Sequence, residues 1–103
     1  MRMEDLYRGF VRLHILYHAS VGPVFGLWII KELARHGYRL SPGTLYPLLH
    51  SLERSGHLSS QRQMANGRFR RAYTITPQGQ RALDEAKIKV RELFSEIWDE
   101  RKG

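Results

Sequence analysis

The 103-residue sequence contains no cysteine, so disulfide bonds and thiolate metal sites are excluded. It also contains no run of about 20 apolar residues, the length that a membrane-spanning helix needs. The N-terminal stretch MRMEDLYRGFVRLHIL is interrupted by charges and lacks the apolar segment of a signal peptide. These absences predict a soluble, cytoplasmic protein without a membrane partner.

Acidic residues are few: 10 Asp and Glu stand against 17 Lys and Arg, which gives a formal net charge of +7. The pI near 10.3 favours a polyanionic partner such as nucleic acid, although pI alone does not distinguish nucleic acid from an anionic membrane surface. A chain of 103 residues forms one domain with a modest core. A deep pocket or large binding surface is therefore expected to involve a second copy.

Residue patterns typical of enzymes are missing as well. The sequence has no Ser/His/Asp order, no glycine-rich phosphate loop and no paired carboxylates, so we expect neither an enzyme nor a cofactor. His14 and His18 stand four residues apart, on one face of a helix, where they could hold a metal ion. Because no HExxH motif and no third ligand are evident, we interpret both as core-edge histidines and predict no metal site.

Apolar residues at steps of three and four predict two helices in the first third of the chain. The first helix covers residues 3–18, with apolar positions Leu6, Phe10, Leu13, Ile15, Leu16 and Tyr17. Gly22 and Pro23 end it. The second helix carries Leu27, Ile30, Leu33 and Ala34. It is expected to end near Gly37, which can adopt the left-handed conformation of a C-terminal cap.

A third helix is predicted from Ser41 to Gly56. Ser41 suits the N-cap, Pro42 suits the first helical position, and Leu40 and Leu45 have the spacing of a hydrophobic staple. One apolar stripe, expected in the core, consists of Leu45, Leu48, Leu49 and Leu52. Pro47 removes one backbone hydrogen bond from this helix unless the first turn is loosely wound, and the sequence leaves these alternatives open.

The remainder of the chain predicts a hairpin and a last helix. The stretch HLSSQRQM alternates roughly between polar and apolar residues, and RRAYTIT is rich in β-branched and aromatic residues. Between them stands Asn66-Gly67, a strong signal for a two-residue hairpin turn. Thr76 and Pro77 have the pattern of a helix N-terminus. The helix that follows carries a heptad seam of Leu83, Ala86, Val90, Leu93 and Ile97.

The order of helix, helix, helix and hairpin is that of a winged helix-turn-helix module, so we predict a mainly α fold with a small β-hairpin (α+β). We assign residues 1–75 to the DNA-binding domain and residues 76–103 to a C-terminal dimerisation helix, together forming one compact unit. The residues predicted to contact double-stranded DNA from the third helix are Ser41, Thr44, Tyr46, His50, Ser51 and Arg54. Those predicted from the wing are Arg62, Asn66, Gly67, Arg68, Arg70 and Arg71. Alternation along the strand puts Arg71 on one face with Tyr73, so not all four arginines need reach DNA.

The stretches SPGTLYPLLHSLERSGHL and GRFRRAYTITPQGQRAL resemble the PadR family of transcriptional regulators. This resemblance implies a homodimeric winged-helix protein, usually a repressor, that binds a roughly palindromic operator and is often released by a small molecule. The single short C-terminal helix resembles the compact subgroup. One departure is GPVFGLW, where the family usually has GPxHGYE, so any effector or folding role of those positions does not carry over to Phe25, Leu27 and Trp28.

The heptad seam is either a dimer interface or the private core of one chain. Phe94 and Trp98 widen its apolar surface near the chain end, where a small monomer has little left to cover them, so we favour dimerisation. Leu6, Phe10 and Leu13 of the first helix are expected to contribute from the partner. Trp98 is either a packing residue of that interface or part of a pocket for a small hydrophobic or aromatic effector.

The function predicted from these patterns is sequence-specific, DNA-binding transcriptional regulation, with repression as the expected outcome. The alternative from another class is a protein-interaction module that uses the winged-helix fold without specific DNA binding and whose basic charge is incidental.

Overall fold

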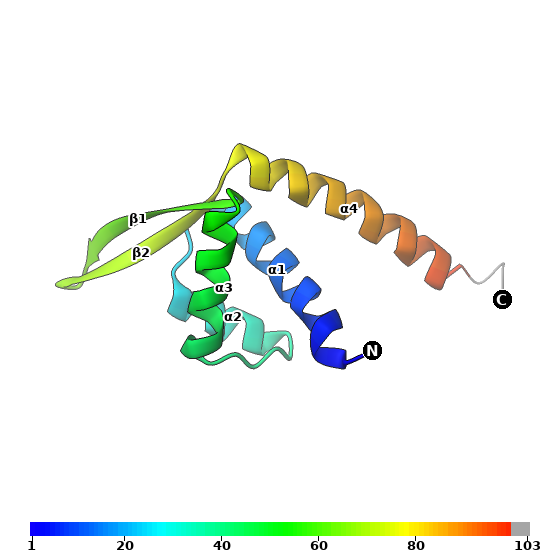
Figure 1. Ribbon diagram of the computed structural model, residues 1–103, viewed down its shortest axis with the longest axis horizontal. Helices are drawn as coiled ribbons and strands as arrows, with labels where there is room; N and C mark the ends of the chain where they lie inside the picture. The colour runs from blue at the N-terminus through cyan, green and yellow to red at the C-terminus, as the bar shows by residue number, and fades with distance from the viewer. Residues whose placement is uncertain (100–103) are drawn as a thin grey trace.

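The computed structural model of the chain describes residues 1–99 and contains four helices and one hairpin within that range (Figure 1). Their bounds are α1 Met3–Val21, α2 Gly26–Arg35, α3 Pro42–Arg54, β1 Leu58–Ala65, β2 Arg68–Ile75 and α4 Pro77–Ile97. Residues 100–103, the end of the predicted C-terminal segment, lie outside the described residues. Within the described range, none of the helices has the length and apolarity needed to cross a membrane.

The core lies among α1, α2, α3 and the base of the hairpin. Its fully buried side chains are Ile15, Ile29, Leu33, Leu45, Leu49, Leu58 and Tyr73. Three members of the predicted stripe on α3 are confirmed as core, because Leu45 and Leu49 are completely buried and Leu52 is nearly so. The fourth, Leu48, is partly buried and packs against this core. Burial of such side chains supplies most of the free energy that holds the three helices together.

The first turn of α3 is regular, which resolves the alternatives for Pro47. The backbone N–H of Leu45 donates to the carbonyl of Ser41 over 2.9 Å, and the helix continues unbroken through Pro47 to Arg54. Ser41 occupies the N-cap position, although its hydroxyl donates to the Thr44 hydroxyl over 3.3 Å instead of capping a backbone N–H. Pro47 therefore removes a single intrahelical hydrogen bond, the one to the carbonyl of Gly43.

Strands β1 and β2 form the predicted antiparallel wing, with register from Leu58↔Ile75 at the base to Ala65↔Arg68 at the tip. Asn66 and Gly67 make the turn with φ of 52° and 76°, the two positive values that a type I′ turn requires. A β-bridge between Val24 and Tyr73, with N–H···O distances of 2.9 and 2.8 Å, joins the base of the wing to the α1–α2 connection. The base is thereby fixed while the tip projects from the body (Figure 1).

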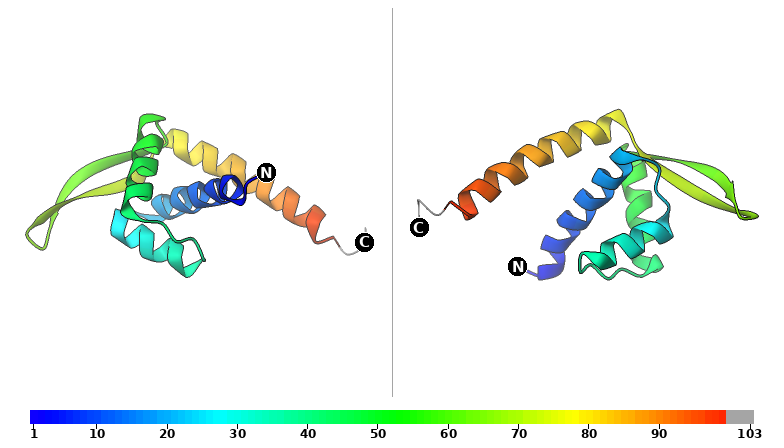
Figure 2. Two further views of the ribbon diagram at one scale, coloured as in Figure 1. Left: turned by 60° about the horizontal axis from the view of Figure 1, so that its bottom comes forward. Right: turned by 180° about the vertical axis from the view of Figure 1, so that it is seen from behind.

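Helix α4 begins against the base of the wing and then leaves the body. The Thr76 hydroxyl accepts from the N–H of Gly79 over 3.0 Å, which confirms the predicted N-cap. A Cβ on Gly79 would lie 2.1 Å from the carbonyl oxygen of His57, so only glycine permits this close approach. From that anchor α4 runs past α1, and α4 and the wing project in opposite directions (Figure 2).

Candidate nucleic-acid interface

The outer face of α3 is polar and open to solvent. Ser41, Thr44, His50, Ser51 and Arg54, all predicted to contact DNA, are exposed. The spacing of four residues places Tyr46, His50 and Arg54 in a row along the helix.

Gly43 and Pro47 are also exposed on this face, although the sequence analysis did not include them among the contacts. The helical repeat alone would have found them, because they fall between the predicted polar positions. A Cβ added to Gly43 would meet only the Ser41 hydroxyl, at 3.8 Å, so packing within the chain does not explain this glycine.

Tyr46 differs from the other predicted contacts on α3 because it is half-buried. Its ring lies across the start of α2, where a Cβ on Gly26 would be 2.6 to 2.7 Å from the ring atoms and hydroxyl. Gly26 therefore makes room for Tyr46, and the tyrosine links α3 to α2. Only part of the Tyr46 side chain is available to a ligand.

The wing carries four exposed arginines, and aromatic rings support two of them. The guanidinium of Arg62 lies 4.2 Å from the centre of the Phe69 ring, and that of Arg70 lies 4.2 Å from the centre of the Phe25 ring. Such cation–π contacts leave the N–H groups at the edge of the guanidinium free to bind an anion. Phe25, one of the departures from the family pattern, thus orients a wing arginine.

Arg71 is held by the chain itself. Its Nη1 donates to the Ser60 hydroxyl over 3.2 Å, and this hydroxyl donates to Glu53 Oε2 over 2.7 Å. Beneath this network burial raises the pKa of the Tyr73 hydroxyl, and the nearby Glu53 carboxylate adds to the shift. Tyr73 is therefore a neutral core residue that supports the wing, and Arg71 has fewer N–H groups free than the other wing arginines.

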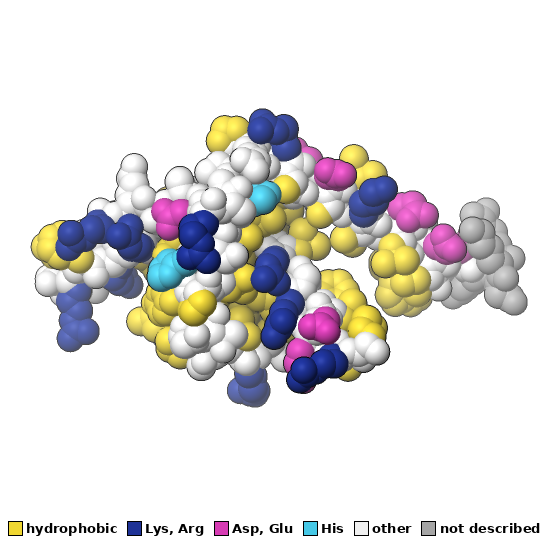
Figure 3. Space-filling view, in the orientation of Figure 1, with side chains coloured by type: hydrophobic (Ala, Val, Ile, Leu, Met, Phe, Trp, Pro, Cys, Tyr) yellow, Lys and Arg dark blue, Asp and Glu magenta, His cyan; other side chains and the backbone are white. Residues whose placement is uncertain are grey.

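A hollow of about 370 Å³ lies between α3, the start of α2 and the wing, and it contains five of the predicted DNA contacts. Its lining residues are Phe25, Gly26, Leu27, Tyr46, His50, Arg68, Phe69, Arg70, Arg71 and Tyr73. No acidic residue of the described chain lines it. Dark-blue Lys and Arg side chains gather at this wing end of the molecule (Figure 3).

The structure does not place every predicted contact in this hollow. Ser41 and Thr44 lie at the N-terminal end of α3, and Thr44 lines a separate hollow of about 300 Å³ between α1 and α3. Asn66 and Gly67 form the tip of the wing, and Arg62 and Arg54 also lie outside the hollow. The candidate surface therefore consists of the hollow, the N-terminal end of α3 on one side and the tip of the wing on the other.

Away from this surface the structure supplies a residue that the sequence analysis missed. No third ligand for His14 and His18 is evident in the sequence, but in the structure His36 lies with them and one nitrogen of each ring falls within 4.8 Å of the others. His36 is the C-cap of α2, 18 residues from His18 in the sequence, so its proximity depends on how α2 packs on α1. No local spacing could have shown it.

Of the dimerisation residues predicted on α4, one is buried within its own chain and most of the others form an open face. Leu83 is only 3% exposed and belongs to the core of its own chain, which corrects its assignment to the interface. Ala86 is half-buried, whereas Val90, Leu93 and Ile97 are 45%, 54% and 57% exposed. The rest of the seam is therefore not a private core of the single chain.

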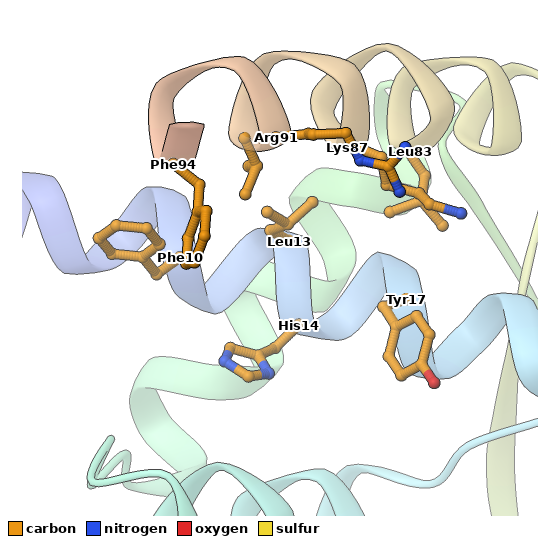
Figure 4. Close-up of a pocket in the computed structure, with 9 residues that line it drawn as sticks. Phe10, Leu13, His14, Tyr17, Leu83, Lys87, Arg91 and Phe94 are labelled. Atoms are coloured by element: carbon orange, nitrogen blue, oxygen red, sulfur yellow. The ribbon is translucent and has the colours of Figure 1, made fainter. Parts of the chain in front are cut away.

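A groove of about 510 Å³ runs between α4 and α1 (Figure 4), and of Val90, Leu93 and Ile97 only Val90 lines it. Its lining residues are Phe10, Leu13, His14, Tyr17, Leu83, Lys87, Val90, Arg91 and Phe94. Leu6 and Trp98, which were also predicted to lie at the interface or in an effector pocket, do not line it. Trp98 is 64% exposed and packs on Phe94, with ring centres 4.8 Å apart.

The fold and the basic surface define a winged helix-turn-helix protein, with α3 at the recognition-helix position and β1–β2 as the wing. The family model described as the transcriptional regulator PadR-like family matches residues 15–85. The chain belongs to the PadR-like family and is a transcriptional regulator with a DNA-binding winged-helix fold.

Individual relatives agree with this assignment. The chain is 50% identical over 95 residues to "Transcriptional regulator Rv3488" of Mycobacterium tuberculosis, covering 92% of this chain and 89% of that protein. It is similar to the crystal structure of a PadR-like transcriptional regulator from Bacillus cereus, with a TM-score of 0.85 and 26% identity over 96% of this chain and 98% of that one. A PadR family regulator from Eggerthella lenta gives a TM-score of 0.78 and 30% identity over 92% and 84% of the two chains.

Proposed function

We propose that the chain is a homodimeric repressor that binds a specific DNA sequence with α3 in the major groove and the wing on the phosphate backbone. The observation that carries this proposal is the hollow between α3 and the wing, where Tyr46 and His50 meet Arg68, Arg70 and Arg71. Bases and phosphates are both within reach of a surface that combines ring, hydroxyl and guanidinium groups. Repression follows when the operator overlaps the site of transcription initiation.

The proposed contacts have two different roles. Thr44 and His50 are exposed on α3 and carry hydrogen-bonding groups suited to base edges. Arg68 and Arg70 are exposed on the wing and suit phosphates, which every duplex offers. Gly43 lacks a side chain where the backbone of α3 would approach DNA most closely.

A pair of wing arginines supports the presence of an anion. Arg62 and Arg71 face each other as cross-strand partners, and like charges placed directly opposite destabilise a sheet. Arg62 stacks on the Phe69 ring and Arg71 donates to the Ser60 hydroxyl, and neither contact places a negative charge between the two guanidinium groups. A DNA phosphate bound near the pair would reduce this repulsion. The repulsion in the free protein would therefore favour the DNA-bound state.

The dimer would form through the open face of α4 and the exposed end of α1. The residues that we assign to it are Leu6, Phe10, Leu13, Ala86, Val90, Leu93, Phe94 and Ile97, and Figure 3 shows hydrophobic surface uncovered along α4. A large exposed apolar face is unfavourable in a soluble monomer. A twofold pair would present two α3 helices to successive major grooves, so the operator would be roughly palindromic.

A small hydrophobic or aromatic effector would bind near this interface and release DNA. The groove between α1 and α4 has the volume of a small-molecule site. Most of its lining is apolar, and Lys87 and Arg91 add two charged groups. Trp98 lies beyond the groove, packed on Phe94, and would either close the pocket in the dimer or pack against the partner.

Selection of duplexes from a random pool by the full-length protein tests this function, followed by affinity measurements at several salt concentrations. We expect an inverted-repeat sequence, and affinity for generic duplexes that falls steeply with salt. Thr44→Ala and His50→Ala should each lose on the order of 1–3 kcal/mol against the selected site and keep most non-specific affinity. Weak binding at every salt concentration would instead identify a protein-interaction module.

A further inference from the structure

Three histidines meet where α1 packs against α2, and one of them, His14, also lines the groove between α1 and α4 (Figure 4). His14 and His18 come from α1, and His36 is the C-cap of α2. The ring centre of His14 lies 4.8 Å from that of His36 and 6.2 Å from that of His18. One nitrogen from each ring lies within 4.8 Å of the other two.

A carboxylate completes this group. Glu32 Oε1 lies 3.2 Å from His36 Nε2 and 3.9 Å from His18 Nε2, and the Glu32 side chain is only 13% exposed. The second oxygen, Oε2, accepts from Arg35 Nη1 over 3.0 Å, which fixes the orientation of the carboxylate. Glu32 and His36 are four residues apart, as are His14 and His18, so each helix presents a pair with the spacing that chelates a metal ion.

The chemistry of the donor atoms suits metal binding. Three imidazole nitrogens and a carboxylate oxygen form a donor set that binds Zn²⁺ and similar ions.

The surroundings also resemble those of a metal centre. Trp28 contacts the edge of His18 with ring centres 5.3 Å apart, and Tyr38 contacts His14 with ring centres 5.5 Å apart. Together with Arg35, which holds Glu32, these side chains restrict the directions in which the candidate ligands can point. Outer groups of this kind orient metal ligands and limit the access of water.

From this geometry we propose that His14, His18, His36 and Glu32 form a binding site for one divalent transition-metal ion of the Zn²⁺ class per chain. Bonds of about 2.0–2.2 Å from Zn²⁺ to nitrogen and oxygen require the donor atoms to approach one another by small side-chain rotations. His36 has the freedom for this movement, because its side chain is 43% exposed at the helix end. None of its residues lies on α3 or the wing, so the proposed DNA contacts do not depend on it, although His14 also lines the groove proposed for an effector.

The test uses the untagged full-length protein, freed of metal with a chelator, and titrates it with Zn²⁺ in a calorimeter. We expect one Zn²⁺ ion per chain. Co²⁺ bound in place of Zn²⁺ should give the visible absorption bands of an ion with nitrogen and oxygen ligands. His36→Gln, which leaves the α1 pair intact, should weaken Zn²⁺ binding by about 100-fold, because loss of even an outer partner typically weakens it ~10–100-fold. The matched control His57→Gln changes a histidine outside the cluster and should bind Zn²⁺ like the wild type.

Circular dichroism establishes that each variant is folded before titration. If His36→Gln fails to fold, Glu32→Gln keeps all three imidazoles and should both weaken Zn²⁺ binding and shift the Co²⁺ bands. The proposal is overturned by a stoichiometry well below one ion per chain. It is also overturned if a folded His36→Gln or Glu32→Gln protein binds Zn²⁺ as tightly as the His57→Gln control.

Discussion

Helices α3 and α4 carry apolar stripes of similar spacing, yet the chain treats them in opposite ways. On α3, Leu45 and Leu49 are completely buried by α1, α2 and the wing base. On α4, Leu93 and Ile97 remain 54% and 57% exposed. The difference shows that an apolar period identifies a face that must be covered, while the position of the helix in the fold decides whether its own chain covers it.

The outer faces of the two helices, opposite their apolar stripes, also differ in charge. The outer face of α3 bears Thr44, His50 and Arg54, and the hollow that His50 shares with the wing has no acidic residue in its lining, whereas the outer face of α4 mixes acidic and basic residues (Figure 3). A mixed surface suits solvent, and a basic surface suits a polyanion. The contrast supports the proposal that α3 recognises DNA and that α4 associates with a second copy.

The largest expected effect comes from placing a charge in the α3 stripe. Leu49→Asp would bury a carboxylate among apolar side chains, at a cost of several kcal/mol, which is a large part of the ~5–15 kcal/mol stability typical of a domain. We expect loss of cooperative unfolding in thermal denaturation followed by circular dichroism. A Leu49→Asp protein that melts like the wild type would remove the distinction between the two stripes.

The same substitution on α4 should separate the subunits and leave each one folded. Val90→Asp with Leu93→Asp puts charges on a face that is already exposed in one chain, so a folded monomer is expected by light scattering. Operator affinity should fall by about 100-fold or more, since linking two binding modules typically contributes ~10²–10⁴ in avidity. A double variant that remains dimeric and binds normally would show that α4 is not the interface.

Removal of two wing arginines should have a moderate effect that does not depend on sequence. Arg68→Ala with Arg70→Ala should weaken binding to all duplexes about equally and reduce the slope of log affinity against log salt by about 0.9 per lost contact. Arg81→Ala with Lys89→Ala removes the same charge from exposed positions of α4 and should leave the slope nearly unchanged. Equal slopes in the two variants would count against the wing as a phosphate contact.

The smallest effect is expected at Gly43, where stability and binding should move in opposite directions. Gly43→Ala has room within the chain and should stabilise the helix by up to ~1 kcal/mol, because alanine loses less conformational entropy. The added methyl group should weaken operator binding by reducing the approach of α3 to DNA. Denaturant titration and fluorescence anisotropy measure the two changes, and unchanged anisotropy would place Gly43 outside the interface.

Features set by neighbouring residues were predictable from the sequence. The α3 leucines, the Asn66-Gly67 turn and the Thr76 cap all depend on spacings of a few residues, and all three predictions are confirmed. Their geometry follows from helix periodicity and local backbone preferences, which the sequence displays directly.

Features set by packing between elements were not predictable. The sequence gives no sign that His36 lies beside His14, or that Leu83 belongs to the core of its own chain although it shares the α4 seam. The support of Arg70 by Phe25 likewise depends on where the wing base meets the α1–α2 connection. Each of these contacts joins residues distant in sequence, so only the arrangement of the elements determines it.

Two copies of the chain, joined through α4, should place their α3 helices on one face of a single duplex. Light scattering on the complex with the selected duplex, after size-exclusion chromatography, measures how many 12.1 kDa chains it contains. We predict two chains per duplex at every protein concentration that saturates the DNA, with no stable complex of one chain. A saturated complex containing one chain per duplex would contradict the assignment of the exposed α4 stripe to a dimer interface.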